Sequence, residues 1–255
     1  MLASFTVENY RAFARQQNIE IRPLTLFFGW NSGGKSALVR FLPLLAESIK
    51  AKGSPIWLSG EIGRGATWSE LVCKATERSN LRFALNWSCD PPASAEWDVS
   101  GDVEGRWQEV RNLRTLIGGL ENNYLRDETE LHWPGMLPTF DTTSDLHSDV
   151  DWLEAELAVF ASQVQWISGV RRRPQRVVTY GGGVPPYLRA DGANCLDFLV
   201  AAQLQSTASP LLEMISAFFA GLGEQIVLEN STEGIWRVLF SPSGAPHVRV
   251  NLSDT

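Results

Sequence analysis

The chain has 255 residues, of which 44% are hydrophobic and 20% charged, and its formal net charge is −7. This composition is typical of a globular protein and excludes global disorder, and the length suits one large domain or two modest ones. No stretch approaches 18 uninterrupted apolar residues, which excludes a transmembrane helix, and the first residues lack the pattern of a secretory signal. We therefore expect a cytoplasmic protein that does not contact a membrane.

The acidic charge is concentrated in the middle of the chain. Residues 90–156 contain 16 acidic residues and 4 arginines, a balance of −12, whereas the rest of the chain contains 13 acidic and 18 basic residues. Pairs typical of loops, such as Pro91 with Pro92 and Gly118 with Gly119, lie in this segment. We interpret it as a partly ordered acidic insertion, whose simplest role is a solvated surface. Because it would repel a nucleic-acid backbone, any such contact would use another face.

The N-terminal part of the chain predicts three strands and a long helix. Residues 4–7 and 18–21 are expected to be short strands. Residues 24–28 are almost entirely apolar, as in a strand that is buried on both faces. From Lys35 onward, apolar residues recur at helical spacing and predict an amphipathic helix, in which Pro43 is expected to introduce a kink.

The remaining elements alternate between helices and strands. Ser209 and Pro210 have the residue types of an N-cap and a first helical position. In chain order we expect a short helix at 68–74, a strand at 81–87, a helix at 152–160, a buried strand at 164–167, helices at 194–205 and 209–221, and closing strands at 226–228, 235–240 and 247–252.

Residues 29–36, Gly-Trp-Asn-Ser-Gly-Gly-Lys-Ser, match the phosphate-binding loop (Walker A) pattern G-x-x-x-x-G-K-[ST]. Glycines allow successive N–H groups to turn toward phosphate oxygens, and the N-terminus of the following helix adds partial positive charge. Lys35 would contact the β- and γ-phosphates, and Ser36 would offer its hydroxyl to Mg²⁺. The pattern predicts a nucleotide site formed by Gly29, Asn31, Ser32, Gly33, Gly34, Lys35, Ser36 and Ala37. A chance glycine-rich turn, or a loop that binds nucleotide without hydrolysis, is the alternative.

The N-terminal sequence FTVENYRAF, followed by the apolar run and GWNSGGKSALV, resembles the opening of ABC-type ATPases of the SMC/RecF/OLD group. In that group an N-[FY]-R-x-F turn precedes a G-x-N-x-x-G-K-S loop. The stretches WISGVRRRPQR and RADGANCLDFL resemble the "AAA family ATPase" branch more loosely. The likeness is strong over residues 1–45, weak over 160–255 and absent over 90–150. It implies an α/β P-loop NTPase of the ABC-ATPase type, with a mixed sheet around the P-loop helix.

The resemblance also implies a domain organisation. Residues 1–89 would form a nucleotide-binding lobe, 90–156 the acidic insertion, and 157–255 a continuation of the ATPase head. In such ATPases a signature motif and a Walker B strand ending in Asp-Glu follow, but the sole Asp-Glu pair here is Asp127 with Glu128, which follows no buried strand. We therefore expect a fragment of a longer ATPase, or a half-head that a second polypeptide completes.

The resemblance implies roles for individual residues as well. Arg11 would contact a phosphate of the nucleotide, although a surface arginine that caps a turn is equally compatible with the sequence. Asn31 would brace the loop or approach the γ-phosphate. Gln165 would contact Mg²⁺ together with Ser36, or simply lie in the core. Trp30 could pack against the fold or form a lid over a nucleotide base, and we expect packing.

Other side chains carry weaker signals. Arg171, Arg172, Arg173 and Arg176 could bind phosphates of a nucleotide or of DNA, or pair with the acidic insertion. The three cysteines form no CxxC pair and the three histidines are scattered, so neither a zinc site nor a disulfide framework is expected.

These features predict a subunit or fragment of an SMC/OLD-like ATPase that binds and hydrolyses ATP with Mg²⁺. Its heads would form a homodimer or higher oligomer, with a second protein and possible DNA as partners, in DNA repair or anti-phage defence. The isolated chain is expected to be inactive. The alternative is a non-hydrolysing, nucleotide-binding scaffold that assembles with an effector protein. A small-molecule kinase suits the Asn-Tyr-Arg turn and its neighbouring strands less well.

Overall fold

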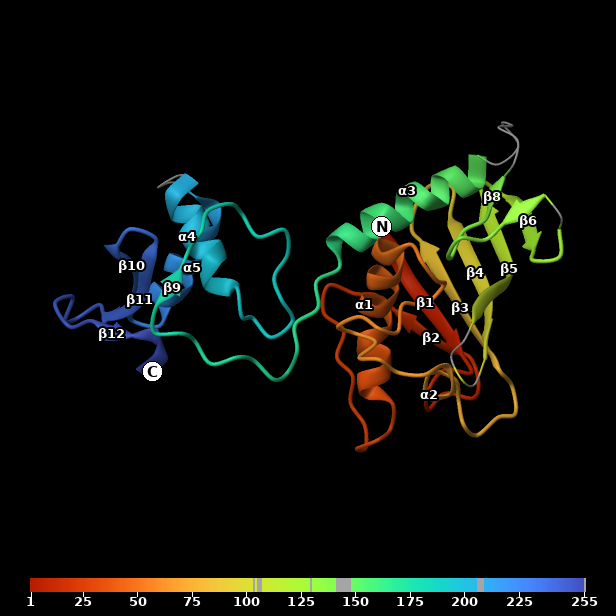
Figure 1. Cartoon of the computed structure of the whole chain (residues 1–255), viewed down its shortest axis with the longest axis horizontal. Helices are drawn as coiled ribbons and strands as arrows, with labels where there is room; N and C mark the ends of the chain where they lie inside the picture. Colours follow the sequence, from red (N-terminus) through yellow and green to blue (C-terminus); the bar gives the residue numbers. More distant parts are fainter. Residues whose placement is uncertain (103, 105–106, 129, 141–147, 206–208, 255) are drawn as a thin grey trace. The chain divides into compact units, whose positions relative to one another are not determined.

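The computed structural model describes residues 1–102, 104, 107–128, 130–140, 148–205 and 209–254. They form two compact units, Met1–Val164 and Gln165–Thr255 (Figure 1). Each unit combines helices with an antiparallel sheet, so the chain is of mixed α/β class. The boundary between these units follows Val164. No helix in the described ranges is long and apolar enough to cross a membrane.

The first unit is built on a six-stranded sheet in which every neighbouring pair is antiparallel. The unit also contains a two-stranded hairpin and the short helix α2 (Trp68–Leu71). In spatial order the sheet strands are β2 (Gln17–Glu20), β1 (Leu2–Glu8), β3 (Asn80–Trp87), β4 (Ala93–Gly101), β5 (Gln108–Ile117) and β6 (Leu120–Leu125), and the hairpin strands are β7 (Leu131–His132) and β8 (Thr139–Phe140).

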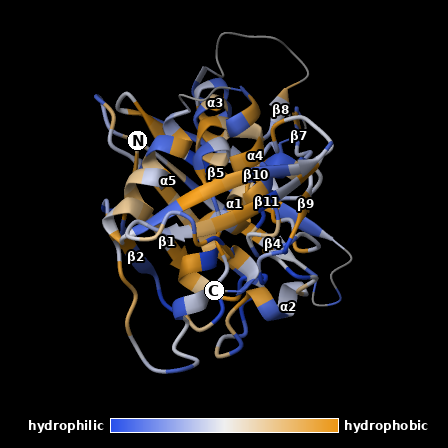
Figure 2. Ribbon diagram, turned by 90° about the vertical axis from the view of Figure 1, so that its left-hand side faces the viewer, coloured by the Kyte–Doolittle hydropathy of each residue, from blue (hydrophilic) through white to orange (hydrophobic). Residues whose placement is uncertain are grey.

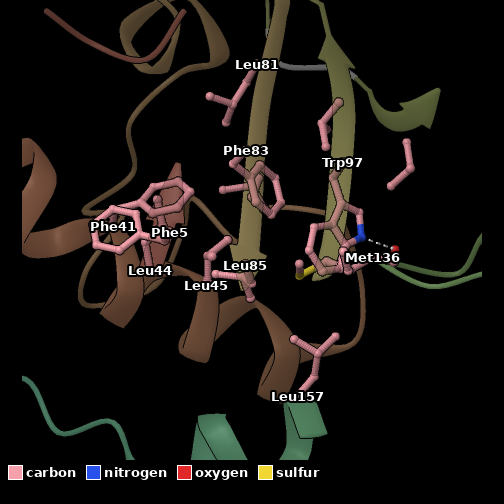
Figure 3. Close-up of a cluster of buried hydrophobic side chains, with 14 of the residues drawn as sticks. Phe5, Phe41, Leu44, Leu45, Leu81, Phe83, Leu85, Trp97, Met136 and Leu157 are labelled. Carbon is pink, nitrogen blue, oxygen red and sulfur yellow. Dashed lines mark hydrogen bonds between the residues drawn. The ribbon is translucent and has the colours of Figure 1, made fainter. Parts of the chain in front are cut away.

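Two helices, α1 (Lys35–Ala51) and α3 (Ser148–Gln163), pack on the apolar face of this sheet. The rings of Phe41 from α1 and Phe83 from β3 meet edge to face, and Phe83 stacks on Trp97 from β4 with 5.0 Å between ring centroids (Figure 3). The indole N–H of Trp97 donates to the carbonyl of Met136 at 2.9 Å. Helix α1 continues past Pro43 to Ala51.

The acidic segment is not a loop-like insertion, because it supplies three of the six sheet strands, β4 to β6. Its alternate residues face opposite sides of the sheet. Trp97 is buried in the core, while Asp98 lies on the outer face and pairs with Arg82 at 2.9 Å. A strand can therefore carry many carboxylates and still bury one face. Residues 141–147, which begin the DTTSDLHSDVD run, lie outside the described ranges.

Residues 24–28 do not form the expected buried strand. Leu24, Leu26 and Phe28 are 74%, 62% and 86% exposed, and Trp30 is 89% exposed, so the expectation that Trp30 packs is also wrong. A strand buried on both faces needs neighbouring strands and covering layers, and no described residue forms a backbone-to-backbone hydrogen bond with this segment. The segment therefore adds no strand to the sheet. The sheet is antiparallel throughout, whereas we expected a mixed sheet.

The second unit contains two helices and a small antiparallel sheet, with its own core around Leu199, Val200 and Trp236. The hydrophobic central residues of its two longest strands stand out in Figure 2. The strand expected at 164–167 is absent, and the last strand is shorter than expected. The elements are β9 (Val178–Thr179), α4 (Cys195–Gln205), α5 (Pro210–Gly221), β10 (Glu224–Thr232), β11 (Ile235–Pro242), β12 (Val250–Asn251) and a 3₁₀ turn at Leu252–Asp254.

Candidate phosphate-binding site

The loop at residues 29–36 leads directly into α1. Gly34 is the N-cap residue, with φ at 88°, and the first turn of the helix carries no acidic side chain. The N–H of Gly33 donates to the carbonyl of Trp30 at 3.1 Å. Within the described chain, no group accepts a hydrogen bond from the N–H groups of Gly34, Lys35 and Ser36. These donors lie at the positive end of the α1 dipole, where an anion is stabilised.

The side chain of Lys35 folds back over its own loop. Its ammonium donates to the carbonyl oxygens of Gly29 at 2.7 Å and Trp30 at 2.6 Å. An ammonium group has three N–H donors, so these two contacts leave one donor for a ligand. The lysine therefore holds the curvature of the loop and places a positive charge beside it.

The turn at residues 9–13 packs against the loop. Tyr10 and Phe13 exchange backbone hydrogen bonds of 3.0 and 2.8 Å, which close the turn. A Cβ atom added to Gly34 would lie 2.6 Å from Cζ of Phe13 and 3.1 Å from Cβ of Ala12. The structure thus brings together the Asn-Tyr-Arg-Ala-Phe turn and the glycine-rich loop, which are separated by 15 residues or more in the sequence.

Arg11 is held at this turn in a left-handed conformation, with φ at 52°. Its N–H donates to the carbonyl of Leu71 at 2.8 Å, and the hydroxyl of the buried Tyr10 beside it donates to the carbonyl of Ala37 at 3.3 Å. The side-chain amide of Asn9 donates to two further backbone carbonyls. A left-handed backbone is strained for a residue other than glycine and persists only where its surroundings enforce it. The neighbouring segments therefore fix the position of Arg11.

A cavity of about 580 Å³ lies between these segments. Its volume is within the range of small-molecule and cofactor sites. Three cationic side chains and one carboxylate line it, so its charge favours a polyanion. The lining residues are Arg11, Ala12, Asn31, Ser32, Gly33, Gly34, Lys35, Ser36, Ala37, Glu70, Val72 and Lys74. Every residue expected from the sequence to bind nucleotide lines the cavity except Gly29, which contacts Lys35.

Four lining residues were not expected from the sequence: Ala12, Glu70, Val72 and Lys74. The carboxylate of Glu70 accepts hydrogen bonds from the N–H of Thr67 at 2.8 Å and from its hydroxyl at 3.2 Å. These hydrogen bonds, with smaller contributions from Arg11 and Lys74, lower the pKa of Glu70 below its usual value. The sequence Thr-Trp-Ser-Glu has the form of a capping box, which marks the start of α2 but gives no indication of a cavity.

The two residues expected to contact Mg²⁺ lie in different units. Ser36 lines the cavity of the first unit. Gln165 lies in the second unit, where its amide donates to the carbonyls of Leu188 at 2.6 Å and Trp166 at 3.2 Å. Across the described ranges there is no cluster of three or more His, Cys, Asp or Glu side chains suited to a metal. A serine hydroxyl fits the way Mg²⁺ binds in phosphate sites, with few protein ligands besides phosphate oxygens and water.

The arginine cluster lies on the second unit and is exposed. Within that unit, Arg176 pairs with Asp254 at 2.5 Å. Arg172 and Arg173 line a smaller cavity of about 220 Å³ beside the N-terminus of α4. The three cysteines are free thiols, of which Cys73 is buried.

Neither a scan against protein-family models nor a search of curated proteins found a match to this chain. The loop sequence and the geometry of the cavity around it are therefore the features that point to a function. Together they define a mixed α/β protein with a cationic cleft at the N-terminus of α1.

Proposed function

We propose that the first unit binds ATP with Mg²⁺ in the cavity at the N-terminus of α1. The observation that carries this proposal is that one cavity is lined by the Lys35 ammonium, Arg11 and three N–H groups for which the described residues provide no acceptor. Fixed N–H donors and positive side chains directed at one space are the groups that bind phosphate oxygens in proteins.

Each group has a specific role in this proposal. The N–H groups of Gly34, Lys35 and Ser36 bind phosphate oxygens, and Lys35 and Arg11 neutralise their charge. The hydroxyl of Ser36, together with phosphate oxygens, holds Mg²⁺. When bound, the metal ion stabilises the negative charge that develops on a transferred phosphoryl group.

We further propose that the chain is a subunit or fragment of a cytoplasmic SMC/OLD-like P-loop ATPase that works as a dimer or oligomer of heads. The resemblance of the N-terminal residues supports this, together with the contact between Phe13 and Gly34 that joins the two similar motifs. Among the described residues, Glu70 is the sole carboxylate lining the cavity, and Thr67 engages it. Hydrolysis in this proposal requires a carboxylate from a further lobe or a second protein. DNA repair or anti-phage defence, with DNA as a partner, is proposed from the resemblance alone.

A non-hydrolysing scaffold is the second candidate. The described part of the cavity offers no carboxylate other than Glu70 to activate water, and this favours a protein that binds nucleotide without hydrolysing it. In this version nucleotide binding would lock an assembly with an effector protein.

The test is calorimetric binding of ATP with Mg²⁺ to the full chain and to Lys35→Ala. Lys50→Ala is the matched control, because Lys50 is an exposed lysine of the same helix outside the cavity. We expect Lys35→Ala to weaken binding at least roughly tenfold, the size of one charged hydrogen bond, and Lys50→Ala to bind as the wild type does. Failure of the wild type to bind, or unchanged binding by Lys35→Ala, would overturn the proposal. Phosphate release measured in the assembled complex separates the ATPase from the scaffold.

A further inference from the structure

One part of the cavity lining lies outside the loop and the turn to which phosphate binding was assigned. Glu70, Val72 and Lys74 belong to α2 and the segment that follows it. Backbone hydrogen bonds from Arg11 to Leu71, at 2.8 Å, and from Cys73 to Asn9, at 3.1 Å, tie this segment to the turn that carries Arg11. The lining after α2 is therefore as firmly positioned as the turn.

The chemistry of Glu70 restricts what can lie beside it. Its pKa is lowered by the hydrogen bonds from Thr67, so the carboxylate is ionised at neutral pH and only accepts hydrogen bonds. It would repel a phosphate group. The part of a ligand that contacts Glu70 must therefore donate hydrogen bonds and carry no negative charge, although Arg11 and Lys74 in the same lining favour a ligand with negative charge elsewhere.

In a nucleotide, the uncharged donors nearest to the phosphates are the ribose hydroxyls. A carboxylate that accepts hydrogen bonds from ribose hydroxyls is a recurrent device in nucleotide sites. The cavity, at about 580 Å³, has room for more than the phosphates alone. We propose that Glu70 binds the ribose hydroxyls of the nucleotide whose phosphates occupy the loop, so that the cleft selects ribonucleotides. This inference rests on the proposed nucleotide site.

The test compares three ligands in the presence of Mg²⁺: ATP, 2′,3′-dideoxyATP and inorganic tripolyphosphate. Their affinities are measured by calorimetry for the full wild-type chain and for Glu70→Gln. A glutamine can serve in a capping box as glutamate does, so this variant keeps an acceptor for the Thr67 N–H. Glu77→Gln is the matched control, because Glu77 is an exposed acid of the same region outside the cavity.

We expect the wild type to bind ATP roughly 10- to 100-fold more tightly than dideoxyATP, as the loss of hydrogen bonds to a charged group predicts. Glu70→Gln is expected to reduce this ratio to within about threefold without weakening tripolyphosphate, because an uncharged acceptor binds a hydroxyl less strongly and no longer repels phosphate. Glu77→Gln is expected to keep the wild-type ratio.

Two results would overturn the inference while the nucleotide site stands: equal affinity of the wild type for ATP and dideoxyATP, or undiminished discrimination by Glu70→Gln. The comparison of ATP with dideoxyATP in the wild type needs no variant, so it still tests the inference if Glu70→Gln fails to fold. If neither ATP nor tripolyphosphate binds the wild type, or if Lys35→Ala binds both as the wild type does, the proposed function fails and this inference fails with it.

Discussion

The ring of Phe13 occupies the space that a side chain on Gly34 would need. A Cβ atom at Gly34 would lie 2.6 Å from Cζ of Phe13, and the backbone there has φ at 88°. Two independent constraints thus require glycine at this position of the loop. One of them comes from a turn that lies about twenty residues earlier in the chain.

Gly34→Ala tests this contact. We expect it to destabilise the first unit by about 1–3 kcal/mol, because it adds both a clash and backbone strain, and to abolish nucleotide binding. Gly65→Ala separates the two causes, since Gly65 has φ at 69° but no atom near its added Cβ. Urea denaturation of both variants measures the difference. Equal losses for the two would show that the contact with Phe13 costs nothing.

Arg11→Gly should change stability and binding in opposite directions. Glycine adopts the left-handed conformation without strain, so we expect the free energy of unfolding to rise by about 0.5–1 kcal/mol. The affinity for inorganic tripolyphosphate should fall roughly tenfold with the loss of one charged contact. Arg64→Gly is the matched control, because Arg64 also has positive φ, at 57°, and lies outside the cavity lining. A similar affinity loss in Arg64→Gly would contradict a specific role for Arg11.

The buried carboxylate of Asp149 should make stability depend on pH. It accepts hydrogen bonds from the hydroxyls of Thr115, at 2.5 Å, and Tyr124, at 2.7 Å. Burial by itself would raise the pKa of Asp149, but these hydrogen bonds, together with others from the Asn122 side chain and the backbone, outweigh burial and hold the pKa below its usual value. Burial and the bond to Asp149 raise the pKa of Tyr124.

Because the folded-state pKa of Asp149 is depressed, its stabilising contribution is present above the unfolded pKa, near 4, and is lost as the pH falls through the folded value. Asp149→Asn should cost about 1.5–3 kcal/mol at pH 7, and the cost should shrink in acid. Urea denaturation of both proteins at several pH values measures this. A cost that stays constant down to pH 2 would contradict it.

The acidic segment should unfold together with the rest of the first unit. Trp97→Ala removes a fully buried side chain and its hydrogen bond to Met136, and we expect a loss of about 3–5 kcal/mol. The amides of β1 and β3 should lose hydrogen-exchange protection to the same extent as those of β4, because they form one sheet. Retained protection in β1 would indicate that the acidic segment is a separate domain.

Residues 24–28 should contribute little to the stability of this chain. Leu26→Ser is expected to change the free energy of unfolding by less than about 0.5 kcal/mol, as surface substitutions do. Leu85→Ala, at a fully buried strand position, should cost about 2–5 kcal/mol. Urea denaturation of both variants compares them. A loss above 2 kcal/mol for Leu26→Ser would show that the apolar run is buried in solution.

The sequence by itself determined the elements whose pattern is local. The 3.6-residue spacing predicted α1, strands were expected at 4–7 and 81–87 where β1 and β3 lie, and Ser209 with Pro210 marked the start of α5. The loop pattern located most of the cavity lining, because its glycines and lysine act within eight consecutive residues. Local geometry of this kind depends on neighbours in the chain, which the sequence lists directly.

Only the tertiary structure decided the rest. Residues 24–28 have the composition of a buried strand, but burial requires partner strands, and none of the described residues supplies one. The acidic segment joined the sheet because its carboxylates alternate with Trp97 and other apolar residues. Glu70 and Lys74 reach the cavity through the hydrogen bonds that tie residues 71–73 to the turn at residues 9–11. Contacts of such long sequence separation have no local pattern, so they emerge only when the chain is folded.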